Sequence, residues 1–176
     1  AAAGTASKLF SIADSLNEGS VSGDTNIGGI VGKMGAFANI SSCENKGDVT
    51  GTASSVGGIV GFMDNGNATA YNRIVACSNS GKISGAAGVG GIAGSVGNYT
   101  DFGKSDDTRD DFACINSGEI NGEDFSTTRA ANAGSGGIVG QAGSNINFYN
   151  NKNSGEINGK FSFTGNANTT ISGVGG

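Results

Sequence analysis

Two short motifs alternate along this chain, and their repetition limits the folds it can adopt more than any other feature does. The first motif reads Asn-x-Gly-x-(Val/Ile)-x-Gly, where x is a variable residue. Its five copies cover residues 17–23, 45–51, 79–85, 116–122 and 153–159. A chain of this kind buries its apolar residues between neighbouring repeats, so we expect one stacked domain.

The second motif reads Gly-Gly-Ile-(Val/Ala)-Gly and lies between copies of the first. Its four copies cover residues 28–32, 57–61, 90–94 and 136–140. Residues 173–176 repeat the Gly-Val-Gly-Gly sequence of residues 88–91, so a further copy is expected to begin there. We therefore expect residues 1–176 to be a single repeat domain, an excised or processed segment with an incomplete last repeat.

Alternation of polar and apolar residues indicates strands rather than helices. In the first motif one aliphatic residue stands between polar residues, at Val21, Val49, Ile83, Ile120 and Ile157. A period of two places these side chains on one face of a strand, and we expect that face to point inward. A second strand is expected at each Gly-Gly-Ile motif. A third is expected before each Asn of the first motif, in segments such as 39–44, 73–78 and 146–151.

Equivalent residues are unevenly spaced. Consecutive Asn residues of the first motif are 28, 34, 37 and 37 residues apart. Insertions at 62–72, 95–111 and 123–135 explain the differences, as expected for coils that carry loops at fixed places. The predicted fold is all-β, a right-handed parallel β-helix (β-solenoid) of about five coils, with three short strands per coil and variable loop insertions.

Either face of the strand at the second motif could be buried, and their residues differ. One face carries Ile30, Ile59, Ile92 and Ile138 together with Met34, Met63, Val96 and Ala142. The opposite face includes Lys33, Ser95 and Gln141. We expect the Ile face in the core, where each buried aliphatic side chain contributes on the order of 1.5 to 3 kcal/mol.

The Asn residues of the first motif are candidates for a structural ladder. If equivalent residues stack one coil apart, like side chains lie about 4.8 Å from each other. Each carboxamide could then donate to one neighbour and accept from the other. The residues concerned are Asn17, Asn45, Asn79, Asn116 and Asn153. Asn-x-Gly is also a common surface turn signal, so exposed turns are the alternative interpretation.

Cys43, Cys77 and Cys114 occupy one repeat position, two residues before the Asn. Adjacent coils could bring two sulfur atoms within disulfide range. An odd number of cysteines with parallel side-chain directions instead favours buried free thiols. The chain has no His and no Cys-x-x-Cys pair, so no zinc site is expected.

Composition argues against several classes of function. The net charge is −5 and no cluster of Lys or Arg is present, so nucleic-acid binding is not expected. No apolar run is long enough to span a bilayer, so membrane insertion by this segment is not expected either. Without His, a Ser or Cys nucleophile lacks its commonest general base, and we expect no enzyme and no catalytic residue.

Acidic residues in the second insertion are the candidates for metal binding. Asp106, Asp107, Asp110 and Asp111 could act as Ca²⁺ ligands, although their spacing is not that of an EF-hand loop. A solvated loop is the simpler interpretation. We therefore expect no resident cofactor and keep Ca²⁺ as the alternative.

Two glutamates hold equivalent outward positions in the fourth and fifth copies of the first motif. Glu119 and Glu156 follow Lys82 in this column, and a solvated face is the simpler interpretation. Paired carboxylates could also perform acid–base chemistry on a glycosidic bond.

Aromatic residues lie largely in or beside the insertions. They are Tyr71, Tyr99, Phe102, Phe125, Phe148, Tyr149, Phe161 and Phe163. They could fold the loops back over the coils, or they could form a patch that binds glycans or a neighbouring protein.

Read together, the Gly-Gly-Ile-Val-Gly and Asn-x-Gly-x-Ile-x-Gly elements resemble the Gly-Leu/Ile-Val-Gly repeats called GLUG motifs. The resemblance covers most of residues 17–176. GLUG repeats occur in large secreted or surface-anchored bacterial proteins, including some adhesins and immunoglobulin A peptidases. The resemblance implies a passive extracellular scaffold. The His-Glu-x-x-His zinc motif of those peptidases is absent here, so no catalytic residue is carried over.

These observations predict a non-enzymatic structural protein, extracellular or on the cell surface, in an adhesin stalk or a head-to-tail fibre. Its partners would be neighbouring subunits or flanking repeats stacked end to end. Surface glycans or host proteins are further candidate partners for its loops. The alternative is a carbohydrate-binding or polysaccharide-degrading β-helix that uses loop carboxylates.

Overall fold

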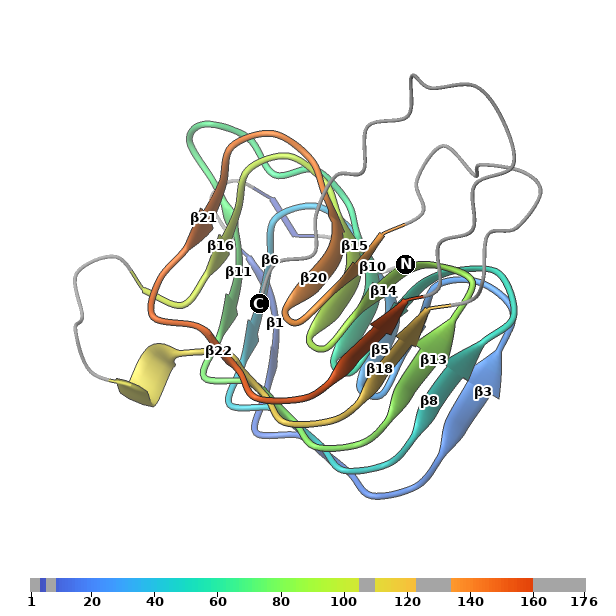
Figure 1. The fold of residues 1–176 in the computed structure, drawn as a ribbon. Coiled ribbons are helices and arrows are strands. Elements are labelled where there is room, and N and C mark those ends of the chain that lie inside the picture. Colours follow the sequence, from blue (N-terminus) through green and yellow to red (C-terminus); the bar gives the residue numbers. More distant parts are fainter. Residues whose placement is uncertain (1–3, 6–8, 105–109, 123–133, 160–176) are drawn as a thin grey trace, which may run out of the picture.

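The computed structural model describes residues 4–5, 9–104, 110–122 and 134–159 of the chain. Successive coils stack so that equivalent strands pair in five parallel sheets (Figure 1). Within these ranges one 3-10 turn, η1 (Asp110–Phe112), lies beside the stack (Figure 1). The predicted all-β solenoid is confirmed, while its right-handed winding stays a prediction.

We number the sheets in the order in which one coil passes through them. Sheet 1 contains β1 (Phe10–Ala13), β6 (Ala38–Ser41), β11 (Asn72–Val75), β16 (Thr100–Phe102) and β21 (Ile146–Phe148). Sheet 2 contains β2 (Leu16–Asn17), β7 (Glu44–Asn45), β12 (Ser78–Asn79), β17 (Ile115–Asn116) and β22 (Lys152–Asn153). Sheet 3 contains β3 (Val21–Gly23), β8 (Val49–Gly51), β13 (Ile83–Gly85), β18 (Ile120–Gly122) and β23 (Ile157–Gly159).

The Gly-Gly-Ile motifs connect the last two sheets. Sheet 4 contains β4 (Ile27–Gly28), β9 (Ser54–Gly57), β14 (Ala87–Gly90) and β19 (Ser135–Gly136). Sheet 5 contains β5 (Val31–Met34), β10 (Val60–Met63), β15 (Ala93–Val96) and β20 (Val139–Ala142). A complete coil therefore has five short strands where the sequence predicted three, because each motif bends in its middle and contributes to two sheets.

Corners between the sheets use left-handed backbone conformations at repeating positions. Between sheets 1 and 2 the corner residues include Ser42 at φ 52°, Ala76 at φ 53° and Asn150 at φ 56°. These corners explain why the strands of sheet 1 end before the positions predicted for them. Left-handed non-glycine residues are uncommon, so the stacked strands on both sides must hold these corners in place.

Sheets 4 and 5 lie back to back inside the coil, between sheet 1 and sheet 3 (Figure 1). Glycines allow this close approach. A Cβ at Gly61 would lie 2.5 Å from the backbone N of Ile27, and one at Gly94 would lie 2.4 Å from that of Val56. The last Gly of the second motif therefore lets the two sheets touch through their backbones.

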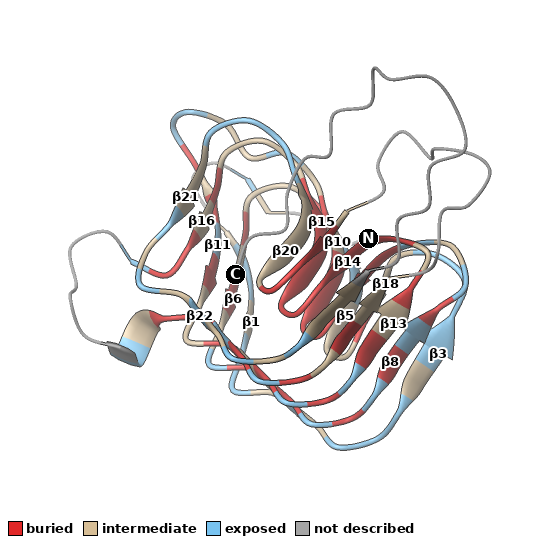
Figure 2. Cartoon of the chain, in the orientation of Figure 1, coloured by how far each residue is buried: buried red, intermediate tan, exposed pale blue. Residues whose placement is uncertain are grey.

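This double layer divides the apolar interior in two. The large core, between sheets 1 and 5, contains Met34, Ala38, Ile40, Cys43, Ile59, Val60, Met63, Ile74, Cys77, Ile92, Ala93, Val96, Phe102 and Cys114. The small core, between sheets 3 and 4, contains Val49, Val56, Ile83, Val89 and Ile120. Figure 2 shows both as buried segments concentrated in the central coils.

The predicted facing is confirmed for sheet 3 and needs correction for sheet 5. Ile59 and Ile92 are fully buried as expected, but the adjacent Val60 is equally buried, because Ile59 lies in the bend before β10. Ser95, expected on the outer face, is also buried and its hydroxyl lies 2.9 Å from that of Ser55. Both faces of the central strand β15 are therefore covered, whereas Lys33 in β5 is exposed as predicted and Ala142 in β20, predicted in the core, is also exposed.

The second insertion also differs from its predicted bounds of 95–111. Residues Thr100–Phe102 form β16 inside that range, and the inserted residues lie between β16 and β17. Phe102 is fully buried at the position that Ile40 and Ile74 hold in the preceding coils, so it belongs to the large core and not to a loop.

Candidate functional site

The Asn residues of the first motif form a continuous hydrogen-bonded column, the Asn ladder. Nδ2 of Asn17 donates to Oδ1 of Asn45 at 2.7 Å, and the three following steps measure 2.7, 2.8 and 2.8 Å. The second N–H of each amide donates to the carbonyl of the Gly two residues later, as from Asn45 to Gly47 at 2.7 Å. Asn45, Asn79 and Asn116 are buried, so the structure has the internal ladder and not exposed turns.

The second motif makes room for this ladder. A Cβ at Gly58 would lie 2.5 Å from Cγ of Asn79, and one at Gly91 would lie 2.3 Å from Cγ of Asn116. The second Gly of Gly-Gly-Ile therefore allows the bend between sheets 4 and 5 to lie directly against the side-chain amides of the Asn ladder. The ladder forms a polar boundary between the large and small cores, and the two motifs depend on each other.

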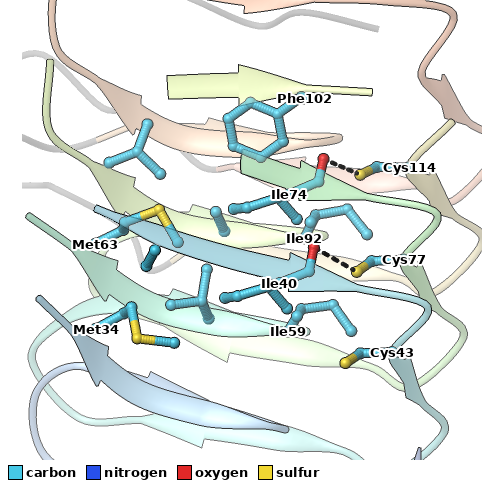
Figure 3. Close-up of a cluster of buried hydrophobic side chains, with 14 residues drawn as sticks. Met34, Ile40, Cys43, Ile59, Met63, Ile74, Cys77, Ile92, Phe102 and Cys114 are labelled. Atoms are coloured by element: carbon cyan, nitrogen blue, oxygen red, sulfur yellow. Dashed lines mark hydrogen bonds between the residues drawn. The ribbon is translucent and has the colours of Figure 1, made fainter. Parts of the chain in front are cut away.

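The three cysteines stack beside the ladder in the large core as free, buried thiols (Figure 3). The Cys114 thiol donates to the carbonyl of Ile74 at 3.2 Å. Interaction with the Cys114 thiol, together with burial, raises the pKa of Cys77 to about 12. Interaction with Cys77, together with burial, raises the pKa of Cys43 well above its usual range. Protonated thiols of this kind are poor nucleophiles and poor metal ligands.

The outward column on sheet 3 pairs opposite charges. Nζ of Lys82 lies 3.2 Å from Oε2 of Glu119, and the backbone N of Lys82 donates to Oδ1 of Asp48 at 3.0 Å. Glu119 also accepts from Nδ2 of Asn121 and of Asn158, both at 3.1 Å. The bond from Asn121 and the Lys82 ammonium lower the pKa of the Glu119 carboxyl. Glu119 thus pairs with donors from three residues and not with the carboxylate of Glu156.

The Ca²⁺ candidates are largely beyond what the structure describes. Asp106 and Asp107 lie outside the described residues, while Asp110 and Asp111 begin η1. Asp101 in β16 accepts from Nδ2 of Asn147 at 2.8 Å. Within the described residues, no group of three His, Cys, Asp or Glu side chains is arranged to hold a metal ion.

One open hollow lies beside sheet 1, with a volume of about 220 Å³. Its lining residues are Leu9, Thr69, Ala70, Tyr71, Arg73 and Asp101. The Tyr71 ring packs edge to face against that of Tyr99, with centroids 5.4 Å apart. Two of the predicted aromatic residues therefore meet beside the first insertion. Phe125, Phe161 and Phe163 lie outside the described residues.

Sequence reasoning missed several polar residues that hold the loops. Asn72 is fully buried, accepts from the backbone N of Ala38 at 3.1 Å and donates to the carbonyl of Asp64 at 2.6 Å. The side chains of Asn65 and Asn98 each accept from the next coil at 2.7 Å. Asn72 does not recur at its position in other coils, so no periodic signal could reveal it.

The fold defines the class of the protein. Searches against family models, curated proteins and solved structures found no match to this chain. The described residues contain no helix with the length and apolar character needed to cross a bilayer. Its class is set by the fold alone: a parallel β-solenoid held by an internal Asn ladder.

Proposed function

We propose that this chain is a non-enzymatic structural protein of the cell exterior, acting as a stalk segment of a surface adhesin or as a fibre subunit. The uninterrupted stack carries this proposal. The Asn ladder runs through five coils, and three of the five sheets do the same. Such a stack lengthens by about 4.8 Å per coil without changing its cross-section, which suits a spacer or a fibre.

The environment of Glu119 supports a passive role. A general acid in glycoside hydrolysis needs a raised pKa. The Glu119 carboxyl instead has a lowered pKa, because Asn121 and Lys82 bind its charged form. The resemblance to GLUG repeats of secreted and surface-anchored proteins supports placing this function outside the cell.

Immunogold electron microscopy on intact producing cells tests the location. We expect antibodies against the folded chain to label the outside of unpermeabilised cells. Label that appears only after permeabilisation would overturn the extracellular role. Incubation with polysaccharides tests the absence of catalysis, and new reducing ends that disappear in Glu119→Gln would contradict it.

Carbohydrate binding is a second candidate, favoured by the hollow beside sheet 1. Tyr71 lines this hollow, with Arg73 and Asp101 beside it as hydrogen-bonding groups. An apolar ring face next to a few polar groups is a common way to hold a small ligand.

Titration calorimetry with acidic polysaccharides, with and without Ca²⁺, tests this candidate. Arg73→Gln should weaken binding at the hollow, whereas Lys82→Gln on sheet 3 serves as the matched control. Loss of Ca²⁺-dependent binding in Asp107→Ala and Asp110→Ala would assign the ligand to the second insertion instead. No heat of binding with any polysaccharide would remove the candidate.

A further inference from the structure

The Asn ladder has a direction, and its two ends are complementary. In the interior each Nδ2 donates both to the next Asn and to a Gly carbonyl of its own coil. Among the described residues, Nδ2 of Asn153 donates to Gly155 O alone, at 2.9 Å. Oδ1 of Asn17 accepts there only from the backbone N of Gly19, at 3.3 Å. Within the described residues, the fifth coil thus has an amide hydrogen that meets no acceptor, and the first coil has an amide oxygen with spare capacity.

The Gly of the first motif shows the same asymmetry. A Cβ at Gly47, Gly81, Gly118 or Gly155 would lie 2.0 or 2.1 Å from the carbonyl O of the equivalent Gly one coil earlier. A Cβ at Gly19 would have Asn17 Oδ1, at 3.9 Å, as its nearest neighbour among the described atoms. The described chain therefore gives no steric reason for Gly at position 19, whereas a coil stacked against the first coil would.

Apolar columns would continue across a junction between the fifth coil of one copy and the first coil of another. In sheet 3 the column of Val and Ile would join Ile157 to Val21. In sheet 1 Phe148, whose exposed fraction is 51%, would cover Ile12 in the way that it now covers Phe102. The junction would therefore bury an aromatic side chain that the single chain leaves half in water.

The charges on the two end faces are also compatible. In the register of sheet 2 and the adjoining turn, Ser154 would meet Glu18, and Glu156 would meet Ser20. Lys152 would meet Leu16, whose exposed fraction is 54%. No two like charges would face each other at these positions, so electrostatic repulsion would not oppose the contact.

We infer that copies of this chain bind head to tail, with the Asn153 face of one copy against the Asn17 face of the next. This inference rests on the structural role proposed above and names the partner as a second copy. Nδ2 of Asn153 donates to Oδ1 of Asn17 in the other copy, which extends the ladder. The backbone N–H of Glu18 in that copy donates to Asn153 O of the first copy. Within the chain, Lys46 N donates to Asn17 O in the same way at 2.8 Å. Because the two faces differ, the contact propagates into rods.

Sedimentation velocity over a range of concentrations, with electron microscopy of the same samples, tests the inference. We expect the wild-type chain to form rods of increasing length, and Gly19→Ala to remain a monomer with an unchanged thermal midpoint. Gly81→Ala is the matched control, because its Cβ would lie 2.1 Å from Gly47 O in the same chain and should lower the midpoint.

A second variant blocks the opposite face. Phe148→Asp would place a charge against Ile12 of the other copy, and we expect it also to remain a monomer. Because each variant keeps one intact face, an equimolar mixture of Gly19→Ala and Phe148→Asp should form dimers that grow no further. This mixing result distinguishes a head-to-tail junction between two different faces from nonspecific association.

Three results would overturn the inference. They are a wild-type chain that stays monomeric at every concentration, rods of normal length from Gly19→Ala, and a mixture that fails to dimerise although Phe148→Asp is folded. If Gly19→Ala is misfolded, rods of normal length from Phe148→Asp alone would overturn the inference. A monomer that still labels the cell surface would refute only this inference, whereas rods found only inside cells would refute the extracellular role and leave the junction intact.

Discussion

The large and small cores solve the same packing problem in different ways. Among the described residues, the apolar side chains of the small core are all Val or Ile, contributed by sheets 3 and 4. The large core mixes Met34, Met63, Phe102 and three cysteines with aliphatic residues (Figure 3). β-branched side chains suit a narrow space between two sheets, whereas Met and Cys fill an irregular one.

The difference shows where the repeat can vary. In the small core sheet 3 supplies Val or Ile in every coil, whereas the sheet 4 column runs through Ile27, Val56 and Val89 and then changes to Ser135. In the large core one column changes from Ile40 and Ile74 to Phe102. Two connections that border this core, residues 64–71 and the segment between β16 and β17, also carry insertions. The third insertion lies between β18 and β19, next to the small core, and there Ser135 replaces the Val of the preceding coils. Irregular filling and loop insertion therefore occur together at both cores.

Ile92→Asp should have the largest effect, since it places a carboxylate in the fully buried large core with no partner. We expect loss of the cooperative unfolding transition, measured by circular dichroism during thermal denaturation. Ile92→Leu provides the control and should keep the transition. A folded Ile92→Asp protein would show that the large core is open to water and would end the comparison.

Truncation compares the two cores directly. Ile83→Ala in the small core should cost about 4 kcal/mol and Met63→Ala in the large core about 2 kcal/mol, both within the range for such truncations. The small core has rigid backbone on both sides and cannot collapse around the cavity, whereas Met34 and Val96 can move. Urea denaturation measures both values, and equal costs would mean that the cores do not differ in rigidity.

Asn79→Ala tests the boundary between the cores. It leaves Nδ2 of Asn45 without its acceptor and Oδ1 of Asn116 without its donor, both buried. We expect a loss of about 3 kcal/mol in urea denaturation. Asn153→Ala at the end of the ladder breaks fewer bonds and should cost less. Equal losses would indicate that the ladder does not act as a buried network.

Alkaline pH tests the thiols of the large core. The pKa of Cys77 is raised to about 12 in the folded state, so the unfolded chain loses this proton first as the pH rises. Stability should therefore be full below the ordinary thiol pKa of about 8.5 and should fall by about 1 kcal/mol by pH 9.5. Urea midpoints between pH 7 and 9.5 measure the slope. A Cys77→Ala protein should show a shallower one, and an identical slope would exclude Cys77 as the cause.

Lys82→Asp, on the exposed column of sheet 3, should have the smallest effect on stability. It removes a cation from Glu119, so the lowered pKa of that carboxyl should rise towards its ordinary value. Glu119 stabilises the fold above its unfolded pKa, and this contribution is lost as the pH falls through the lowered folded value. An NMR titration should show the Glu119 carboxyl becoming protonated at a lower pH in wild type than in Lys82→Asp. A destabilisation comparable with that of Ile92→Asp would contradict the facing of this strand.

Several parts of the fold could be predicted because they depend on local pattern. The alternation around Val49 and Ile83 indicates a strand with one buried face, and the recurrence of Asn45 and Asn79 indicates stacking. The burial of Ser95 and Val60 could not be predicted in this way. The burial of Ser95 depends on sheet 5 lying behind sheet 4, where its hydroxyl meets that of Ser55, whereas the burial of Val60 depends on sheet 1 facing sheet 5 across the large core.

The repeated motifs are sufficient to predict that equivalent residues stack, which columns they form and that the chain is all-β, because a repeated motif imposes the same local geometry on every coil. Contacts between coils establish that sheets 4 and 5 fold inward, that two cores result and that Gly58 and Gly91 touch the Asn ladder. A Cβ at these glycines would clash with atoms of other coils, and those atoms are not near them in the sequence. The asymmetry between Gly19 and its later equivalents likewise becomes visible only when the coils are in place.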